Sequence, residues 1–183
     1  IQFNTLDFFL IATEGLFVAT PEPTAIENTF IFIKSIYLRK LKLALKEANM
    51  WHICQEEVAK LSNGALKSPL DLINILAGKD LDNGKVFSDL LSDLKFSLIL
   101  NKFRGQVTED LGEQLVEVCN RHLYPSFDFL GNISYDSRVY ESILARNIFI
   151  RKYPYTKTVS DLQNMARRLT GEKQQPIQIK ASK

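Results

Sequence analysis

The chain contains the unbroken apolar run Leu16-Phe17-Val18-Ala19-Thr20, bounded by Gly15 and by Pro21-Glu22-Pro23. A short apolar run between such residues is typical of a strand that is buried on both faces of a sheet. Two later runs have the same character, Phe96-Ser97-Leu98-Ile99-Leu100 and residues 127–133. We therefore predict three short buried strands.

Helical spacing fills the segments around these strands. A short helix is predicted over residues 4–12, ahead of the first strand. Thr24-Ala25-Ile26-Glu27 has the spacing of a capping box, and apolar residues continue at helical intervals as far as Ala44. From residue 48 to residue 94 the helical signals are short, with Pro69 at the first position of one helix. This segment is predicted to be a helical insertion.

A further helix is predicted after the third strand. It begins at Asp136 or Ser137, either of which can cap it. Val139, Ile143 and Leu144 follow with helical spacing. We expect these three side chains to face the protein interior.

Strands that alternate with helices predict an α/β fold: a doubly wound, mostly parallel sheet with flanking helices. We expect a single domain over residues 1–170 that includes the insertion at about 48–94. The last helix of this domain spans residues 159–169. The polar segment 171–183 is expected to be a flexible tail.

The carboxyl ends of parallel strands lie at one edge of a sheet, and ligands of such sheets bind there. Three segments follow the predicted strands, residues 21–24, 101–104 and 134–136. We therefore expect the functional residues in these segments.

The composition is that of an ordinary globular chain. Of 183 residues, 45% are hydrophobic and 24% charged, the mean hydropathy is −0.08 and the formal net charge is +2. These values exclude collagen-like and disordered classes, and charge interrupts every apolar run before the length of a membrane-spanning helix. A net charge so close to zero gives no indication of nucleic-acid binding. Two cysteines form no disulfide framework, so a cytoplasmic location is expected.

The two cysteines lie close in sequence to the two histidines, as His52 and Cys54 and as Cys119 and His122. Structural zinc sites usually have two cysteines two to four residues apart, or two histidines three to five residues apart, and neither pair has such spacing. We expect ordinary thiols and histidines and no metal site.

Common catalytic and phosphate-binding motifs are missing from the sequence. It has no G-x-G, and Gly78-Lys79 and Gly84-Lys85 lack the other residues of the G-x4-G-K-[ST] loop. It also has no G-x-S-x-G and no H-E-x-x-H. These residues therefore provide no phosphate-binding loop.

A series of motifs resembles the MinD/ParA-like ATPases, which are P-loop proteins with a deviant Walker motif. The series extends over nearly the whole chain and is more specific than any one motif. It consists of Thr5-Leu6-Asp7-Phe8-Phe9, Thr20-Pro21-Glu22-Pro23-Thr24-Ala25, Leu98-Ile99-Leu100-Asn101-Lys102, Leu130-Gly131-Asn132-Ile133-Ser134-Tyr135-Asp136-Ser137-Arg138-Val139 and residues 162–169.

The resemblance is to the C-terminal part of that family, because the family's phosphate loop and magnesium-supporting Asp precede the position of Ile1. It implies an intact bacterial protein that binds ATP and Mg²⁺, forms a homodimer and positions cellular machinery such as the division site, flagella or the chromosome. Because the phosphate contacts are missing, this chain alone is expected neither to bind ATP tightly nor to hydrolyse it.

The resemblance also assigns roles to residues that follow the first two strands. Asn101, with its neighbour Lys102, matches the family position whose amide contacts the purine edge. An Asn at a strand end is equally typical of a turn. Glu22 matches a loop acid that reaches the nucleotide ribose across a dimer. The alternative is that Glu22 only stabilises the N-terminus of the following helix through its negative charge.

A third part of the base site is implied by the family loop Ile-Pro-x-Asp. Ile133, Tyr135 and Asp136 match this loop, whereas Ser134 replaces its proline. The resemblance implies that these residues flank the adenine. Simple helix capping by Asp136 is the alternative.

Two other function classes remain open from the sequence. The chain can act as a non-catalytic α/β module that binds a protein partner. Its basic run, Lys34, Arg39, Lys40, Lys42 and Lys46, has no acid within it and can meet an acidic partner, lipid headgroups or DNA. A solvated helix face is the more common explanation of such a run, and nucleic acid is not the expected partner.

Overall fold

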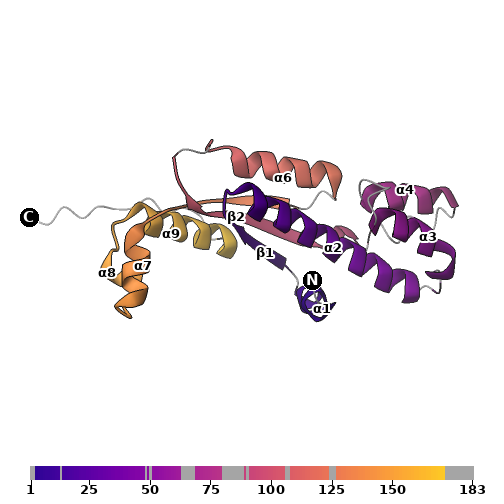
Figure 1. Ribbon diagram of the computed structural model, residues 1–183, viewed down its shortest axis with the longest axis horizontal. Coiled ribbons are helices and arrows are strands. Elements are labelled where there is room, and N and C mark those ends of the chain that lie inside the picture. Colours follow the sequence, from indigo (N-terminus) through magenta and orange to yellow (C-terminus); the bar gives the residue numbers. More distant parts are fainter. Residues whose placement is uncertain are drawn as a thin grey trace, which may run out of the picture.

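The computed structural model describes residues 3–12, 14–47, 49, 51–62, 69–79, 89, 91–105, 108–123 and 127–171. Its centre is a parallel sheet of three strands in the order β1 (Glu14–Ala19), β2 (Lys95–Phe103) and β3 (Phe127–Ser134) (Figure 1). The predicted α/β class and the three strands are confirmed. Within the predicted insertion, residues 63–68 and 80–88 lie outside the described residues, as does the tail from residue 172.

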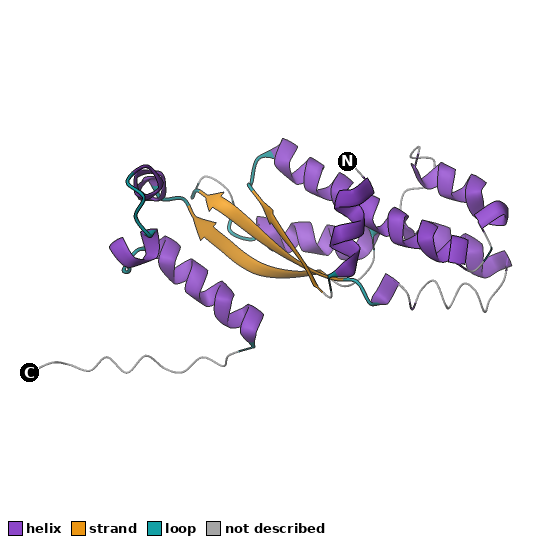
Figure 2. Ribbon diagram, turned by 90° about the horizontal axis from the view of Figure 1, so that it is seen from below, coloured by secondary structure: helices purple, strands orange, loops and turns teal. Residues whose placement is uncertain are grey.

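Helices lie on both faces of the sheet (Figure 2). α2 and α6 connect successive parallel strands and share a hydrophobic core with one face, whereas α9 packs against β3 from the other face. α3 and α4 extend from one end of the molecule, and α7 and α8 lie at the opposite end (Figure 1). The described helices are α1 (Phe3–Ile11), α2 (Pro23–Glu47), α3 (Trp51–Ser62), α4 (Pro69–Lys79), α6 (Leu111–His122), α7 (Ser137–Leu144), α8 (Phe149–Lys152) and α9 (Lys157–Thr170).

The main core is built on phenylalanine rings from the three strands. The Phe96 ring centroid lies 5.5 Å from that of Phe17 and 4.9 Å from that of Phe127. Tyr37 of α2 meets Phe96 edge-on at 5.7 Å, and Phe9 of α1 lies 5.1 Å from Phe17. Each buried aromatic side chain contributes about 1.5–3 kcal/mol through burial alone. This cluster therefore holds α1, α2 and the sheet together.

A second core joins the helical insertion to the far end of α2. Leu41 and Leu45 of α2 pack with Cys54 and Val58 of α3 and with Leu72 of α4, and all five are buried. The long α2 thus serves both cores, one along each half of its length.

The first strand differs from the prediction of burial on both faces. Leu16 and Val18 are 43% and 57% exposed, whereas Phe17 and Ala19 on the other face are buried. Within the described residues β1 is an edge strand, and α9 covers β3 rather than β1. The prediction of burial was therefore wrong for Leu16 and Val18. An unbroken apolar run does not indicate which face of the strand will be covered by a helix.

The start of α2 also differs in detail from the predicted capping box. The helix begins at Pro23, and the Glu22 carbonyl accepts the amides of Ala25 and Ile26 at 3.0 and 3.1 Å. Thr24 is therefore inside the first turn and is not the cap. Proline is favoured at a first helical position because its φ is already helical. The N–H that proline lacks would have no partner within the helix at this position.

Gly112 of α6 is predicted to tolerate no side chain. A Cβ at this position would overlap the ring of Phe129 on β3, whereas a Cβ on the helical Gly78 of α4 would meet no atom within 4 Å. We expect Gly112→Ala to lower the free energy of unfolding by about 1–3 kcal/mol through overpacking. Gly78→Ala is the matched control and should raise it by up to about 1 kcal/mol. Urea denaturation of both variants checks this, and equal effects would contradict the close α6–β3 contact.

Candidate functional site

A hollow of about 710 Å³ lies at the carboxyl ends of β2 and β3. Six residues were predicted for the nucleotide site, and five of them line this hollow, from two segments far apart in the sequence: Asn101, Lys102, Ile133, Tyr135 and Asp136. Ser134, Ser137 and Thr158 add polar groups, and side chains of α7, α8 and α9 form the apolar remainder. The expected edge of the sheet therefore carries a cavity large enough for a small ligand.

An irregularity in the β2–β3 pairing forms the rim of this hollow. Leu100 pairs with Asn132 and Phe103 pairs with Ser134, so Asn101 and Lys102 oppose Ile133 alone. Such a bulge bends the strand locally and redirects side chains. The predicted strand end at residue 100 was wrong, because β2 continues past the bulge to Phe103.

Asn101 has the turn role that was considered as an alternative. Its Oδ1 accepts the Lys102 amide at 2.8 Å, and Lys102 has a φ of 56°, which non-glycine residues rarely adopt. A carbonyl oxygen carries a second lone pair, and the Asn101 NH₂ group can donate two hydrogen bonds. The turn role and a ligand contact are therefore compatible.

Tyr135 is anchored through its backbone, and its ring is partly covered. Its amide donates to the Phe103 carbonyl at 2.9 Å, which extends the β2–β3 contact beyond the strands. The Arg104 guanidinium lies 4.0 Å from the ring centroid, a cation–π distance. The ring remains about half exposed at the mouth of the hollow.

Ser134 is held through both of its backbone groups, and its N–H is a donor that a proline at this position would lack. Its amide donates to Asp161 Oδ2 at 2.9 Å, and its carbonyl accepts from Thr158 Oγ1 at 2.9 Å. Both partners belong to the first half of α9. These two bonds fix α9 to the end of β3.

Asp136 caps α7 and pairs with Arg138. Oδ1 accepts the Arg138 amide at 3.0 Å and Nε at 2.9 Å, and Oδ2 accepts a terminal guanidinium nitrogen at 2.7 Å. These hydrogen bonds from Arg138 lower the pKa of Asp136 below its ordinary value of 3.8. Asp136 is therefore a capped and paired carboxylate at the rim of the hollow.

Residues of α7, α8 and α9 contribute the wall that sequence reasoning missed. α8 has only four residues and is too short for a periodic signal. Nothing in the sequence pattern indicates that α8 lies beside the hollow. These wall residues are Val139, Tyr140, Ile143, Ile148, Phe149, Ile150 and Leu162.

Glu22 is the one predicted site residue that the structure leaves outside the hollow. It is exposed on the loop after β1, next to the N-terminus of α2. Its backbone carbonyl begins the hydrogen bonding of that helix.

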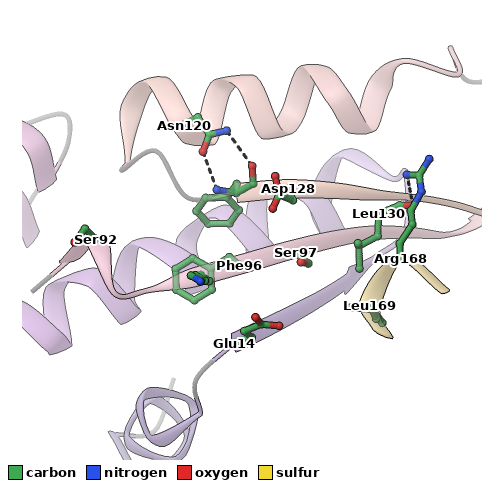
Figure 3. A pocket seen from close by; sticks show the side chains of 11 residues that line it. Glu14, Ser92, Phe96, Ser97, Asn120, Asp128, Leu130, Arg168 and Leu169 are labelled. Carbon is green, nitrogen blue, oxygen red and sulfur yellow. Dashed lines mark hydrogen bonds between the residues drawn. The ribbon is translucent and has the colours of Figure 1, made fainter. Parts of the chain in front are cut away.

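A second cavity of about 750 Å³ lies near the amino ends of the strands (Figure 3). Glu14, Ser97 and Asp128 line it from the three strands, and Arg168 of α9 donates to the Leu130 carbonyl at 2.8 Å. Its carboxylates come from the two outer strands. It contains no candidate residue and borders the part of the sheet that α9 leaves uncovered.

The basic run on α2 is largely engaged within the chain. Arg39 donates two hydrogen bonds to the Asp7 carboxylate at 2.7 and 2.8 Å. Lys42 and Lys46 lie 4.8 and 6.0 Å from the Trp51 ring centroid. These contacts stabilise the packing of α1 and α3 on α2 and favour the structural explanation of the run.

The two cysteines lie in different cores. Cys54 belongs to the cluster of α2, α3 and α4, whereas Cys119 belongs to the main core. Burial raises the pKa of the Cys119 thiol to about 11, so it stays protonated at neutral pH. Within the described residues, no group of three or more His, Cys, Asp and Glu side chains could hold a metal ion.

Comparison of the sequence with protein-family models and with curated proteins finds no match to this chain. Among the residues that the structure describes, no helix combines the length and the apolar character needed to cross a membrane. Function is therefore inferred from the chemistry of the hollow. Its lining combines apolar walls with the Asn101 amide, hydroxyl groups and the charged residues Lys102 and Asp136, which suits a small ligand that has both apolar and polar parts.

The Ser134–Asp161 bond provides a stability test of the site. Ser134→Pro removes the backbone N–H that donates to Asp161, so the Asp161 carboxylate loses this hydrogen bond. We expect the free energy of unfolding to fall by about 1–3 kcal/mol. Ser134→Ala keeps the backbone N–H and is the matched control, with an expected change below about 0.5 kcal/mol. Chemical denaturation compares them. A Pro variant as stable as the Ala variant would contradict the importance of this bond.

The Asp136–Arg138 pair predicts a pH effect. Because the folded-state pKa of Asp136 is lowered, its stabilising effect is complete above the unfolded value and is lost as the pH falls below about 4. Asp136→Ala removes cap and ion pair and should cost about 1 kcal/mol at pH 7. Asp136→Asn keeps a cap acceptor and should cost less. Unfolding curves at several pH values measure the difference in unfolding free energy between each variant and the wild type. This difference should become smaller at acid pH, and a difference that does not change with pH would contradict the prediction.

Proposed function

We propose that the hollow is the adenine side of an ATP site and that the chain is the C-terminal part of a MinD/ParA-like ATPase. The observation that carries this proposal is the convergence of Asn101, Lys102, Ile133, Tyr135 and Asp136 on one cavity. Their two segments lie about thirty residues apart in the sequence, and the sheet brings them together. The five residues belong to two short segments at the paired ends of β2 and β3, where the resemblance expects the base site.

The lining suits the chemistry of a purine base. Ile133, Val139 and Phe149 offer apolar surface for the ring faces, and adenine presents both donors and acceptors along its edge. The Asn101 amide carries both kinds of group and can meet that edge. Arg104 covers one face of Tyr135, which leaves the ring edge and its other face for a ligand.

The phosphate chemistry of this function would come from elsewhere in the intact protein. Hydrolysis in P-loop ATPases depends on loop amides, a Lys and Mg²⁺ that position and stabilise the phosphates. No such loop occurs in this sequence. The chain therefore contributes base binding and part of a homodimer surface that includes Glu22, in a cytoplasmic protein that positions or regulates cellular machinery.

Adenosine is the probe that isolates the proposed base site. Two-dimensional NMR titration of the labelled chain with adenosine should shift the resonances of Asn101, Tyr135 and their neighbours, with weak affinity on the order of millimolar. Asn101→Ala removes the edge contact and should weaken binding about tenfold. Asn74→Ala, an exposed position on the distant α4, is the matched control and should bind as wild type.

Three results would contradict the proposal. They are the absence of shifts around the hollow, equal effects of guanosine and adenosine, and equal affinities of the Asn101 and Asn74 variants. ATP should bind little better than adenosine, because this chain has no phosphate loop. A micromolar affinity for ATP in isothermal titration calorimetry would disprove that expectation.

A further inference from the structure

The tip formed by α7, the following turn and α8 carries a cluster of exposed apolar side chains. Tyr140, Ile143, Leu144, Ile148 and Ile150 are each more than half exposed, and we call them the α7–α8 patch. The tip projects from the carboxyl end of the sheet, away from α3 and α4 (Figure 1). Single exposed apolar residues are ordinary, whereas a cluster marks an interaction surface.

This patch corrects the predicted orientation of α7. Ile143 and Leu144 were expected to face inward, but each is about two thirds exposed. Ser142, which lies between Glu141 and Ile143, is buried instead. α7 packs mainly against α8, so Ile143 and Leu144 are left facing solvent.

The charged residues beside the patch indicate the charge that a partner should carry. Residues 140–155 contain three basic side chains, Arg146, Arg151 and Lys152, and one acid, Glu141, all exposed. The nearby Arg138 is already paired with Asp136. The excess of positive charge disfavours a second copy of the same patch and favours an acidic partner.

The shape of the surface distinguishes a protein partner from a lipid surface. Tyr140, Ile143, Ile148 and Ile150 also line the 710 Å³ hollow, so the patch borders a depression. A lipid surface covers a depression without filling it. An amphipathic helix can insert apolar side chains spaced three and four residues apart.

From this combination we infer that the α7–α8 patch docks an amphipathic helix with an acidic polar face, supplied by a protein partner. The apolar side of the helix contacts Ile143, Leu144 and Ile150, and its acids meet Arg151 and Lys152. The inference is argued from the exposed apolar side chains and the charges beside them, and it does not require a nucleotide in the hollow.

The test uses the full chain and a fluorescently labelled synthetic peptide of about five helical turns. Leucines occupy one face of this peptide and glutamates the other; a second peptide has lysines in place of the glutamates. Fluorescence anisotropy should show saturable binding of the glutamate peptide and binding about tenfold weaker for the lysine peptide.

Variants locate the contact. Ile143→Asp should weaken binding of the glutamate peptide about tenfold, as should the double variant Arg151→Glu with Lys152→Glu. The double variant should also prefer the lysine peptide. Ile31→Asp changes a half-exposed isoleucine on α2 and is the matched control, with unchanged binding expected. Circular dichroism establishes that each variant is folded.

Several outcomes would overturn the inference. They are equal binding of the two peptides, binding of neither peptide, and equal losses in the Ile143 and Ile31 variants. Tighter binding to phosphatidylglycerol vesicles than to the glutamate peptide would assign the patch to lipid. Self-association that Ile143→Asp abolishes in analytical ultracentrifugation would assign it to a second copy. Adenosine binding is measured on the wild-type chain without peptide, and peptide binding is measured without nucleotide, so the two proposals can fail separately.

Discussion

Phe17, Phe96 and Phe127 come from three neighbouring strands and place their rings on the same face of the sheet, where α2 and α6 cover them. Removing these rings from water provides much of the stabilisation of the main core. The same contact aligns the strands, because slipping a strand by one residue would turn its ring to the opposite face. Once the strands are aligned in parallel, their carboxyl ends meet at one edge.

The candidate site depends on departures from regular structure at that edge. The bulge in β2 places two residues opposite one, and the Asn101 side chain stabilises the unusual backbone of Lys102. α9 is held to the end of β3 through both backbone groups of Ser134. These local constraints give the hollow a defined rim. A rim of fixed geometry is needed to recognise a ligand along one of its edges.

The hollow has two walls with different chemistry. The strand side carries an amide, backbone groups and aromatic surface, whereas the helix side is apolar and continues into the exposed patch. A nucleotide base on the strand side and a partner helix on the helix side would lie close together. Such an arrangement offers a physical route by which a partner could sense whether the site is occupied, since both ligands would contact the same short helices.

The sequence by itself determined the α/β class, the three strands and most of the helices, because these follow from local periodicity and from turn and cap residues. Motif resemblance also located five residues that line one hollow, although their chemical roles stay predictions. Tertiary structure alone decided that Leu16, Val18, Ile143 and Leu144 face solvent and that α8 closes the hollow. Apolar spacing specifies that one side of an element avoids water, but which neighbour covers that side depends on contacts between residues distant in the chain.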